Sequence, residues 1–388
     1  MTAYASRSGR PVVLASAGIA TVGVSFGMAR YGLGLLAPDM RSAFRLSHGS
    51  LGILSAASYV AYIVTSVSGA ALVVRVGARA VVVAGGCCAV VGMLIAAAAG
   101  NPAVLFAGLL IAGASAGLVF PPFSDIVSSS LPPTSRSRVL TAISAGTGWG
   151  VALAAPVALL AGGSWRVAWF LFAVVAALAT LWALAVLPPR GQASARAEIV
   201  RLEPSWFLCP RSGPLLIGAV LIGLGSSVYW TFAVDHVQSD GGLTSTQGRL
   251  FLAVVGLASV AGSLSAQAID RIGGRATFVL AAAVEAGALL LLGFVPDHLG
   301  AVFASALMFG AAYNALVAVT VIWGMRVFAS RPSAGLAALM VMQAVGLLAG
   351  PPLLGALADR AGVPAIFAAA AALLLATSGL APREDLRE

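Results

Sequence analysis

The sequence predicts an all-α membrane protein with twelve transmembrane helices in two pseudo-symmetric six-helix bundles. Three observations support this fold class: an apolar composition, a series of apolar runs of membrane-spanning length, and motifs that recur half a chain apart. Of the 388 residues, 60% are hydrophobic and only 9% are charged, whereas soluble domains carry about 25% charged residues. This composition is typical of a protein embedded in a lipid bilayer.

The apolar runs set the number of helices. A spanning helix needs about 20 apolar residues, and twelve stretches of the sequence meet this requirement. They cover residues 11–38, 49–74, 80–98, 102–126, 139–162, 165–187, 213–236, 247–269, 276–295, 299–325, 334–358 and 364–381. Strands are excluded, because none of these stretches alternates between polar and apolar residues and because lipid does not tolerate open sheet edges.

The chain divides at one polar segment. Residues 188–212 contain the longest polar stretch, which is too short to fold alone. We therefore predict an N-terminal six-helix bundle over residues 1–187, a cytoplasmic linker over 188–212 and a C-terminal six-helix bundle over 213–388.

A short charged turn occurs twice, each time between two apolar runs. Its members are Arg75, Gly77 and Arg79 in the first half, and Asp270, Arg271, Gly273 and Arg275 in the second. The equivalent residues Arg75 and Arg271 lie 196 positions apart (271 − 75). Glycine lets the backbone reverse tightly, and the arginines keep the turn in water or among lipid headgroups.

Other landmarks repeat at nearly the same offset. Pro156 and Pro351 are 195 positions apart (351 − 156), and Asp39 and Asp235 are 196 apart (235 − 39). A nearly constant offset indicates two duplicated six-helix halves, which is an architecture typical of secondary transporters.

The repeated turn resembles the signature loop of the major facilitator superfamily, which reads Gly-x-x-x-Asp-Arg/Lys-x-Gly-x-Arg/Lys and joins helices 2–3 and 8–9. The second copy has Ala266 in place of the first glycine, and the first copy has Ala70 and Val74 in place of glycine and aspartate. The resemblance covers nearly the whole chain. It implies a bacterial twelve-helix transporter that works by alternating access, with the turn residues as a gating motif.

Two equivalent helices contain proline next to small residues. Pro156 lies in the fifth predicted helix, and Gly350 and Pro351 lie in the eleventh. Both stretches resemble the Gly-Pro motif of exporters in the same superfamily, although Ala155 stands where glycine is expected. They are either helix-bending points for alternating access or sites of close helix packing. The fourth helix has Leu109 where the superfamily's antiporters carry an arginine, which weakens the case for proton-coupled export.

The distribution of arginine predicts the orientation. With the N-terminus inside, sixteen arginines fall in the inner segments and five at the outer ends, in accord with the positive-inside rule. We therefore expect a multi-pass protein of the bacterial inner membrane with both termini in the cytoplasm.

One arginine is the leading candidate for binding a substrate. Arg30 lies within the first predicted span, where a charge is costly and marks a functional site by default. By the family resemblance, helices 1, 4, 7 and 10 line the central cavity. The other substrate-binding candidates on these helices are Tyr31, Tyr229, Trp230, Tyr313 and Asn314. For Arg30 the alternative is a structural pair with a carboxylate or with carbonyl groups, and for the others it is packing.

Three carboxyl groups are candidates for coupling to an ion. Asp125 follows Pro121-Pro122 near the inner end of the fourth helix, and a salt bridge to Arg75 or Arg136 is the favoured interpretation. Asp235 ends the seventh helix, where an interfacial position is favoured. Glu285 lies in the middle of the ninth helix, where it is either neutral or paired with a neighbouring helix.

The sequence contains no catalytic grouping, no P-loop and no metal-ligand spacing, so no enzyme activity, cofactor or metal is expected. The arginines are dispersed among short loops, which argues against nucleic-acid binding. The expected partners are a small-molecule substrate and the lipid bilayer, with protons as the candidate coupling ion, and we expect a monomer. Two substrate classes compete: a small organic anion, which is favoured, and a lipophilic or drug-like compound. A non-transporting receptor or scaffold is the remaining alternative.

Overall fold

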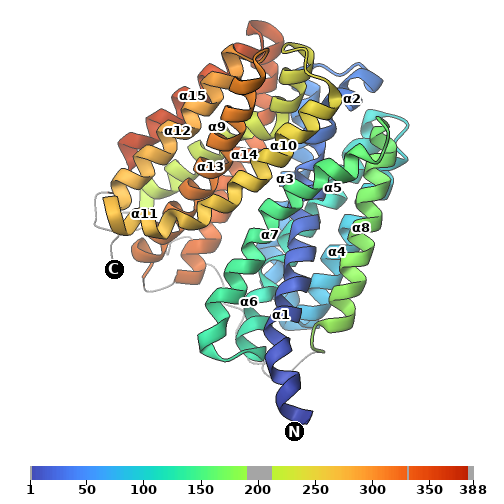
Figure 1. Cartoon of the computed structure of the whole chain (residues 1–388), viewed down its shortest axis with the longest axis vertical. Coiled ribbons are helices and arrows are strands. Elements are labelled where there is room, and N and C mark those ends of the chain that lie inside the picture. The colour runs from blue at the N-terminus through green and yellow to red at the C-terminus, as the bar shows by residue number, and fades with distance from the viewer. Residues whose placement is uncertain (1, 190–211, 330–331, 383–388) are drawn as a thin grey trace. The chain divides into compact units, whose positions relative to one another are not determined.

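The computed structural model describes residues 2–189, 212–329 and 332–382, and most of these residues are helical (Figure 1). Within this part of the chain, eleven helices are long and apolar enough to cross a membrane. This agrees with the predicted all-α membrane fold. The predicted linker, residues 188–212, lies almost entirely outside the described residues.

The chain forms two compact units. The first is drawn from Met1–Gly32 and Val60–Val200, and the second from Leu33–Tyr59 and Arg201–Glu388. The grouping of residues 33–59 with the C-terminal residues could not be predicted, because the predicted boundary rests on the polar linker alone.

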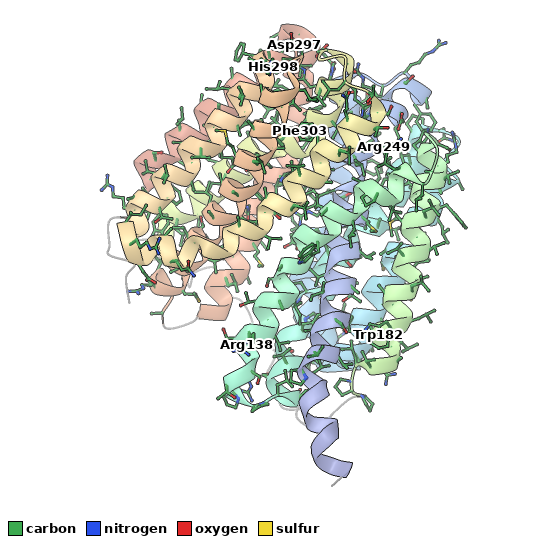
Figure 2. All side chains as sticks on the ribbon, in the orientation of Figure 1. Arg138, Trp182, Arg249, Asp297, His298 and Phe303 are labelled. Atoms are coloured by element: carbon green, nitrogen blue, oxygen red, sulfur yellow. The ribbon has the colours of Figure 1, made fainter. Side chains whose placement is uncertain are left out.

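The first unit is a bundle of long helices joined by short turns. Its elements are α1 (Thr2–Val22), η1 (Gly23–Arg30), the later part of α3 (His48–Val76), α4 (Ala78–Ala97), α5 (Pro102–Val119), α6 (Pro122–Ser130), α7 (Pro133–Leu159) and α8 (Trp165–Val186). Side chains cap several helix starts: Asn101 accepts a hydrogen bond from the backbone N–H of Val104, and Ser164 accepts one from Val167. The Trp182 indole on α8 donates to Ser16 on α1 (Figure 2).

The second unit has the same helical character. Its elements are α2 (Gly32–Phe44), the start of α3, α9 (Ser212–Ser239), α10 (Ser245–Ser259), η4 (Val260–Leu264), α11 (Ser265–Ile272), α12 (Gly274–Phe294), α13 (Leu299–Val327), α14 (Pro332–Ala361), α15 (Val363–Thr377) and η5 (Ser378–Leu380). α12 lies beside α13 and α15, and α9 lies beside α14 (Figure 1). His298, labelled in Figure 2, caps α13 by accepting a hydrogen bond from the Ala301 N–H.

The same close helix crossing occurs in both units. A Cβ atom on Gly27 would lie 2.2 Å from the Gly150 carbonyl carbon, so η1 and α7 pack backbone to backbone. In the second unit, a Cβ on Gly346 would lie 3.0 Å from the Gly223 carbonyl carbon, which brings α9 and α14 together. The two pairs are related by an offset of 196 (223 − 27 and 346 − 150). Small residues at such crossings let helices approach closely in a membrane.

Two predicted spans are not regular α-helices. In the first, residues Gly23–Arg30 form a π-helix, a rare conformation that is frequent at functional sites. In the eighth, predicted over 247–269, α10 and α11 are separated by the 3₁₀ segment η4. Gly262 of η4 lies against α13, since a Cβ there would meet the Asn314 Cβ at 2.3 Å. The continuous apolar pattern of these stretches gave no sign of either break.

Candidate substrate and coupling sites

Aromatic rings surround the Arg30 guanidinium in the first unit. Arg30 is the last residue of η1 and is only 7% exposed. Its Cζ atom lies 4.4 Å from the ring centroid of Tyr62, 5.4 Å from that of Phe26 and 5.5 Å from that of Tyr31. A guanidinium at this distance is attracted to the face of an aromatic ring. The sequence pointed to Arg30 and Tyr31, whereas Phe26 and Tyr62 were missed.

The aromatic candidates of the second unit form one cluster. The Tyr229 and Phe309 rings stack with centroids 3.7 Å apart, and the Tyr313 ring continues the stack 5.7 Å from Phe309. The Trp230 indole meets Phe309 and Tyr313 edge-on at 5.4 and 5.5 Å. We call these four residues the aromatic cluster. Phe309 was missed because a single phenylalanine in an apolar run gives no signal.

The hydroxyl groups of the cluster have partners inside the second unit. The Tyr229 hydroxyl is 2.9 Å from Ser305 Oγ, and Ser305 donates to the Ala288 carbonyl oxygen. The Tyr313 hydroxyl accepts a long hydrogen bond of 3.5 Å from the Gln343 amide. Asn314, predicted to bind substrate, packs with its Cβ against Gly262. The Ser305 contact thus holds Tyr229, which comes from α9, against α13.

A small cavity adjoins the aromatic cluster. Its volume is about 40 Å³, and its lining residues come from α9, α13 and α14. They include Gln343 and Thr320. The space is enough for a water molecule or two. Gln343 connects the cavity to the aromatic cluster, and the sequence reading did not single it out.

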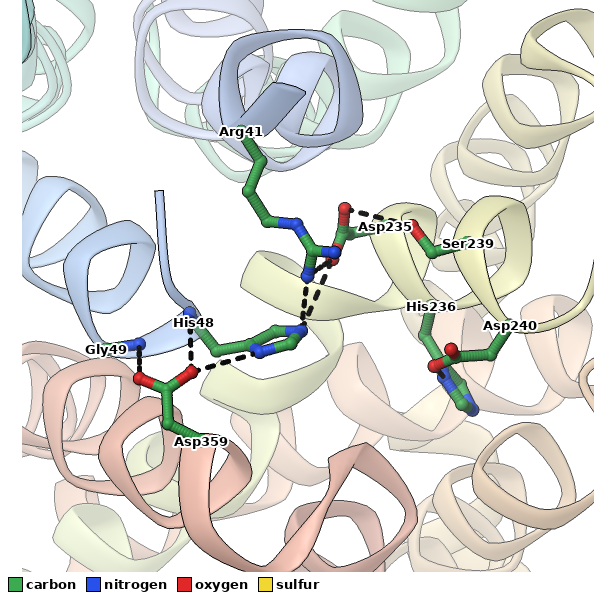
Figure 3. A network of polar contacts seen from close by, with 8 residues as sticks. All are labelled: Arg41, His48, Gly49, Asp235, His236, Ser239, Asp240 and Asp359. Atoms are coloured by element: carbon green, nitrogen blue, oxygen red, sulfur yellow. Dashed lines mark hydrogen bonds and ion pairs between the residues drawn. The ribbon is translucent and has the colours of Figure 1, made fainter. Parts of the chain in front are cut away.

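Charged side chains form a network at one end of the second unit (Figure 3). The Arg41 guanidinium donates to the Asp235 carboxylate at 2.8 Å, and Arg41 also contacts the His48 imidazole. His48 Nδ1 lies 3.2 Å from Asp359 Oδ1. Nearby, Arg249 on α10 donates to Asp39 at 3.3 Å. The equivalent residues Asp39 and Asp235 therefore each have an arginine partner.

Asp235 is more deeply buried than an interfacial position suggests, with 2% of its surface exposed. Its contact with Arg41 offsets only part of the cost of burying a carboxylate. Its role as a coupling residue stays a prediction.

Glu285 on α12 is completely buried and contacts α9. Ser226 Oγ lies 2.7 Å from the Ile222 carbonyl oxygen and 2.6 Å from Glu285 Oε1. Because a hydroxyl has one hydrogen, both contacts are satisfied when Ser226 donates to Ile222 and a protonated Glu285 donates to Ser226. Glu285 Oε2 has no hydrogen-bond partner among the described residues. The arrangement fits a neutral carboxyl better than a carboxylate.

Asp125 does not form the expected salt bridge. Within the described part of the chain it makes no ion pair, and its carboxylate is exposed on α6. The Arg136 guanidinium instead donates to the Leu131 carbonyl oxygen, and Arg75 is exposed at the end of α3. The expectation was wrong because α6 starts a new helix after Pro121, which sends Asp125 to the surface.

The two repeated turns have the same backbone. Gly77 has φ 89° and ψ 151°, and Gly273 has φ 86° and ψ 155°. Positive φ at this point favours glycine. In the first turn Arg79 donates to the Leu184 carbonyl oxygen. In the second, Asp270, Arg271 and Arg275 are exposed, so their gating role stays a prediction.

The proline positions lie inside continuous helices. Pro156 is within α7, and Pro351 is within α14. A Cβ on Gly350 would lie 2.1 Å from Ser227 Oγ, so this glycine packs closely against α9. Bending at these points stays a prediction. Among the described residues, no three acidic, histidine or cysteine side chains could hold a metal ion together.

The chain is similar to known transporters over nearly its whole length. A family model described as "Uncharacterised MFS-type transporter YbfB" matches residues 22–381. Monocarboxylate transporter 11 of Homo sapiens is 31% identical over 373 residues, which cover 90% of this chain and 77% of that protein.

Solved structures share the fold at low sequence identity. A mutant of the nucleoside transporter NupG has a TM-score of 0.80 and 13% identity, covering 94% of this chain and 98% of that one. A bacterial homologue of the human lysosomal transporter Spinster has a TM-score of 0.70 and 15% identity, covering 95% and 93%. These matches confirm the predicted fold class.

Proposed function

Since this chain belongs to the major facilitator superfamily, in the family described as uncharacterised MFS-type transporter YbfB, we propose that it transports a small organic anion by alternating access. The family consists of multi-pass membrane transporters and not of enzymes. In this proposal Arg30 binds the anionic group of the substrate, and protons are the candidate coupling ion.

The observation that carries the proposal is the setting of Arg30. Its charge is buried within a membrane span and ends a π-helix. The faces of the Phe26, Tyr31 and Tyr62 rings attract the guanidinium. This arrangement is compatible with a substrate carboxylate that lies in the plane of the guanidinium and is held by two parallel N–H···O bonds. The name of the human relative, a monocarboxylate transporter, points to the same chemical class.

A second candidate function is the movement of a lipophilic or drug-like compound. The aromatic cluster of the second unit supports it, because stacked rings offer a large apolar surface with few polar groups. In this case transport depends on Trp230 and not on the charge of Arg30.

Transport by purified protein in liposomes tests the proposal. The panel contains short monocarboxylates, aromatic carboxylates and their uncharged amides, each with and without a pH gradient. We expect uptake of carboxylates and not of the matching amides. Uptake of the amides alone would favour the lipophilic substrate class, and no transport by folded protein would favour a receptor or scaffold.

Arg30→Lys sharpens this test. Lysine keeps the positive charge but cannot form two parallel hydrogen bonds to one carboxylate. We therefore expect a loss in apparent affinity of about tenfold to hundredfold, which corresponds to a charged hydrogen bond worth about 1.5–3 kcal/mol. Arg138→Lys is the matched control, because Arg138 is exposed on α7 of the same unit (Figure 2). Equal transport by both variants would exclude Arg30 as the anion-binding group, and a misfolded Arg30→Lys variant would favour a structural role.

A further inference from the structure

A groove lies on the surface of the first unit, between the start of α4 and the end of α8. These two helices lie beside each other (Figure 1). The groove has a volume of about 460 Å³, and Arg79 is the charged residue in its lining. Most of the lining is apolar and consists of Val76, Ala80, Val83, Ala84, Leu184 and Pro189. This end of the unit carries the first repeated turn and is predicted to face the cytoplasm.

The groove ends where α4 and α8 touch. A Cβ atom on Gly86 would lie 2.2 Å from Thr180 Oγ1, so the two helices are in close contact at this point. From the turn at Gly77 to Gly86 the chain advances nine residues (86 − 77), or about 13 Å along α4 at 1.5 Å per residue. The groove therefore runs from the membrane surface toward the interior of the bilayer and is closed at its deep end.

The walls of the groove are apolar side chains on the outside of the unit. Val76 is 50% exposed and Leu184 is 42% exposed. Ala80 and Ala84 are exposed as well, and their spacing of four residues places them on one face of α4. These walls offer an acyl chain a surface of its own polarity.

Arg79 supplies a positive charge at the open end of the groove. This residue is half-buried, and its guanidinium donates a hydrogen bond to the Leu184 carbonyl oxygen on α8. Its Nε atom is buried and has no hydrogen-bond partner among the described residues. Because a guanidinium has five N–H donors, these contacts occupy only part of its capacity and leave donors for an anionic ligand.

The start of α4 adds to this positive field. Gly77 precedes the helix and provides no side-chain cap, and the Val81 N–H donates to the Gly77 carbonyl oxygen. The N–H groups of the three residues in between therefore have no acceptor within the helix. A helix N-terminus with free N–H groups attracts phosphate and other anions.

The two repeated turns differ in charge. The first turn carries Arg75 and Arg79 and has Val74 at the position equivalent to Asp270 of the second turn (270 − 74 = 196). The first turn thus contains two arginines and no carboxylate, whereas the second contains one carboxylate among its arginines. An anion that binds at the first turn meets no repulsion from an acid within the turn itself.

We propose that this groove binds one anionic phospholipid of the cytoplasmic leaflet, with the headgroup phosphate on Arg79 and the start of α4, and with one acyl chain along the apolar walls. Basic pockets between transmembrane helices on the cytoplasmic side are a known form of lipid-headgroup site. The apolar walls favour a lipid over a soluble phosphate, which would leave them uncovered. The bound lipid bridges α4 and α8, and its binding does not depend on the transported substrate.

Native mass spectrometry tests this with the purified full-length protein. The protein is delipidated in detergent and titrated with phosphatidylglycerol or with phosphatidylethanolamine of the same acyl chains. We expect the first phosphatidylglycerol to bind about fivefold or more tightly than phosphatidylethanolamine, the factor typical of one arginine acting on an anionic lipid. In Arg79→Gln this preference is lost. Ala84→Trp fills the groove without changing the charge, and we expect it to weaken the binding of phosphatidylglycerol by a similar factor.

Two variants serve as matched controls. Arg138→Gln removes an exposed arginine from α7 of the same unit. Val91→Trp adds the same bulky ring to α4 at a position that is 48% exposed, beyond the Gly86 contact and outside the lining of the groove. Both variants should bind phosphatidylglycerol with the affinity of the wild type.

Three results would overturn the proposal. In the first, Arg79→Gln keeps the preference for phosphatidylglycerol. In the second, Ala84→Trp binds this lipid as tightly as Val91→Trp does. In the third, glycerol phosphate displaces the lipid at the same concentration as phosphatidylglycerol itself, which would indicate a site for soluble anions. If Arg79→Gln does not give a monodisperse protein, the comparison of Ala84→Trp with Val91→Trp decides.

Discussion

The Glu285–Ser226 contact allows a sharp test of a buried acid in the membrane. Glu285 has no exposed surface, and Ser226 is its one hydrogen-bond partner among the described residues. Removing that partner with Ser226→Ala leaves the carboxyl unsatisfied, which costs about 1–3 kcal/mol of unfolding free energy. We therefore expect Ser226→Ala to destabilise the protein by this amount.

Glu285→Met removes the acid and keeps a side chain of similar length. It eliminates both carboxyl oxygens, including the unpartnered Oε2, and leaves Ser226 bonded to the Ile222 carbonyl oxygen. Replacing a neutral buried polar group by an apolar one of similar shape is close to neutral, so we expect a change within about 1 kcal/mol. In the Glu285→Met background, Ser226→Ala should cost less than about 1 kcal/mol.

The measurement is SDS-induced unfolding in detergent micelles, followed by tryptophan fluorescence, for the wild type, both single variants and the double variant. A coupling energy of about 1–2 kcal/mol between the two sites is expected. A loss of about 3 kcal/mol or more in Glu285→Met would refute the reasoning, because it would indicate an ionised group in a favourable pair. Glu285→Gln controls for shape.

Two further predictions concern topology and packing. Reporters fused within residues 188–212 and at the C-terminus should both report the cytoplasm, as the arginine distribution predicts, and a periplasmic signal from either would overturn the orientation. Gly150→Ala should destabilise the protein by about 1–3 kcal/mol, because its Cβ would lie 2.0 Å from the Gly23 carbonyl oxygen of η1. A Cβ on Gly218 of α9 would meet no other heavy atom within 4 Å, so Gly218→Ala should be neutral or stabilising in the same unfolding assay. Equal losses of stability in both variants would argue against the close crossing of η1 and α7.

Some site residues could be recognised in the sequence and others could not. Arg30 stood out because a charge in an apolar run is costly. Its ring partner Tyr62 comes from α3, and nothing in the order of residues connects the two. The turn Asp359-Arg360-Ala361-Gly362 shows the reverse case: its Asp-Arg-x-Gly pattern is visible in the sequence, whereas the hydrogen bonds that Asp359 accepts from the start of α3 are visible only in the structure.

The sequence by itself determined the membrane class, the repeat and the family, and its twelve predicted spans come within one of the eleven membrane-spanning helices found in the described part of the chain. Each of these features depends on local composition or on a fixed spacing along the chain. The tertiary structure decided the rest. The π-helix at Gly23–Arg30, the break at η4 and the pairing of Asp39 and Asp235 with Arg249 and Arg41 depend on which helices meet. That choice is made by packing between segments far apart in the chain, where small residues let backbones approach and buried charges require partners.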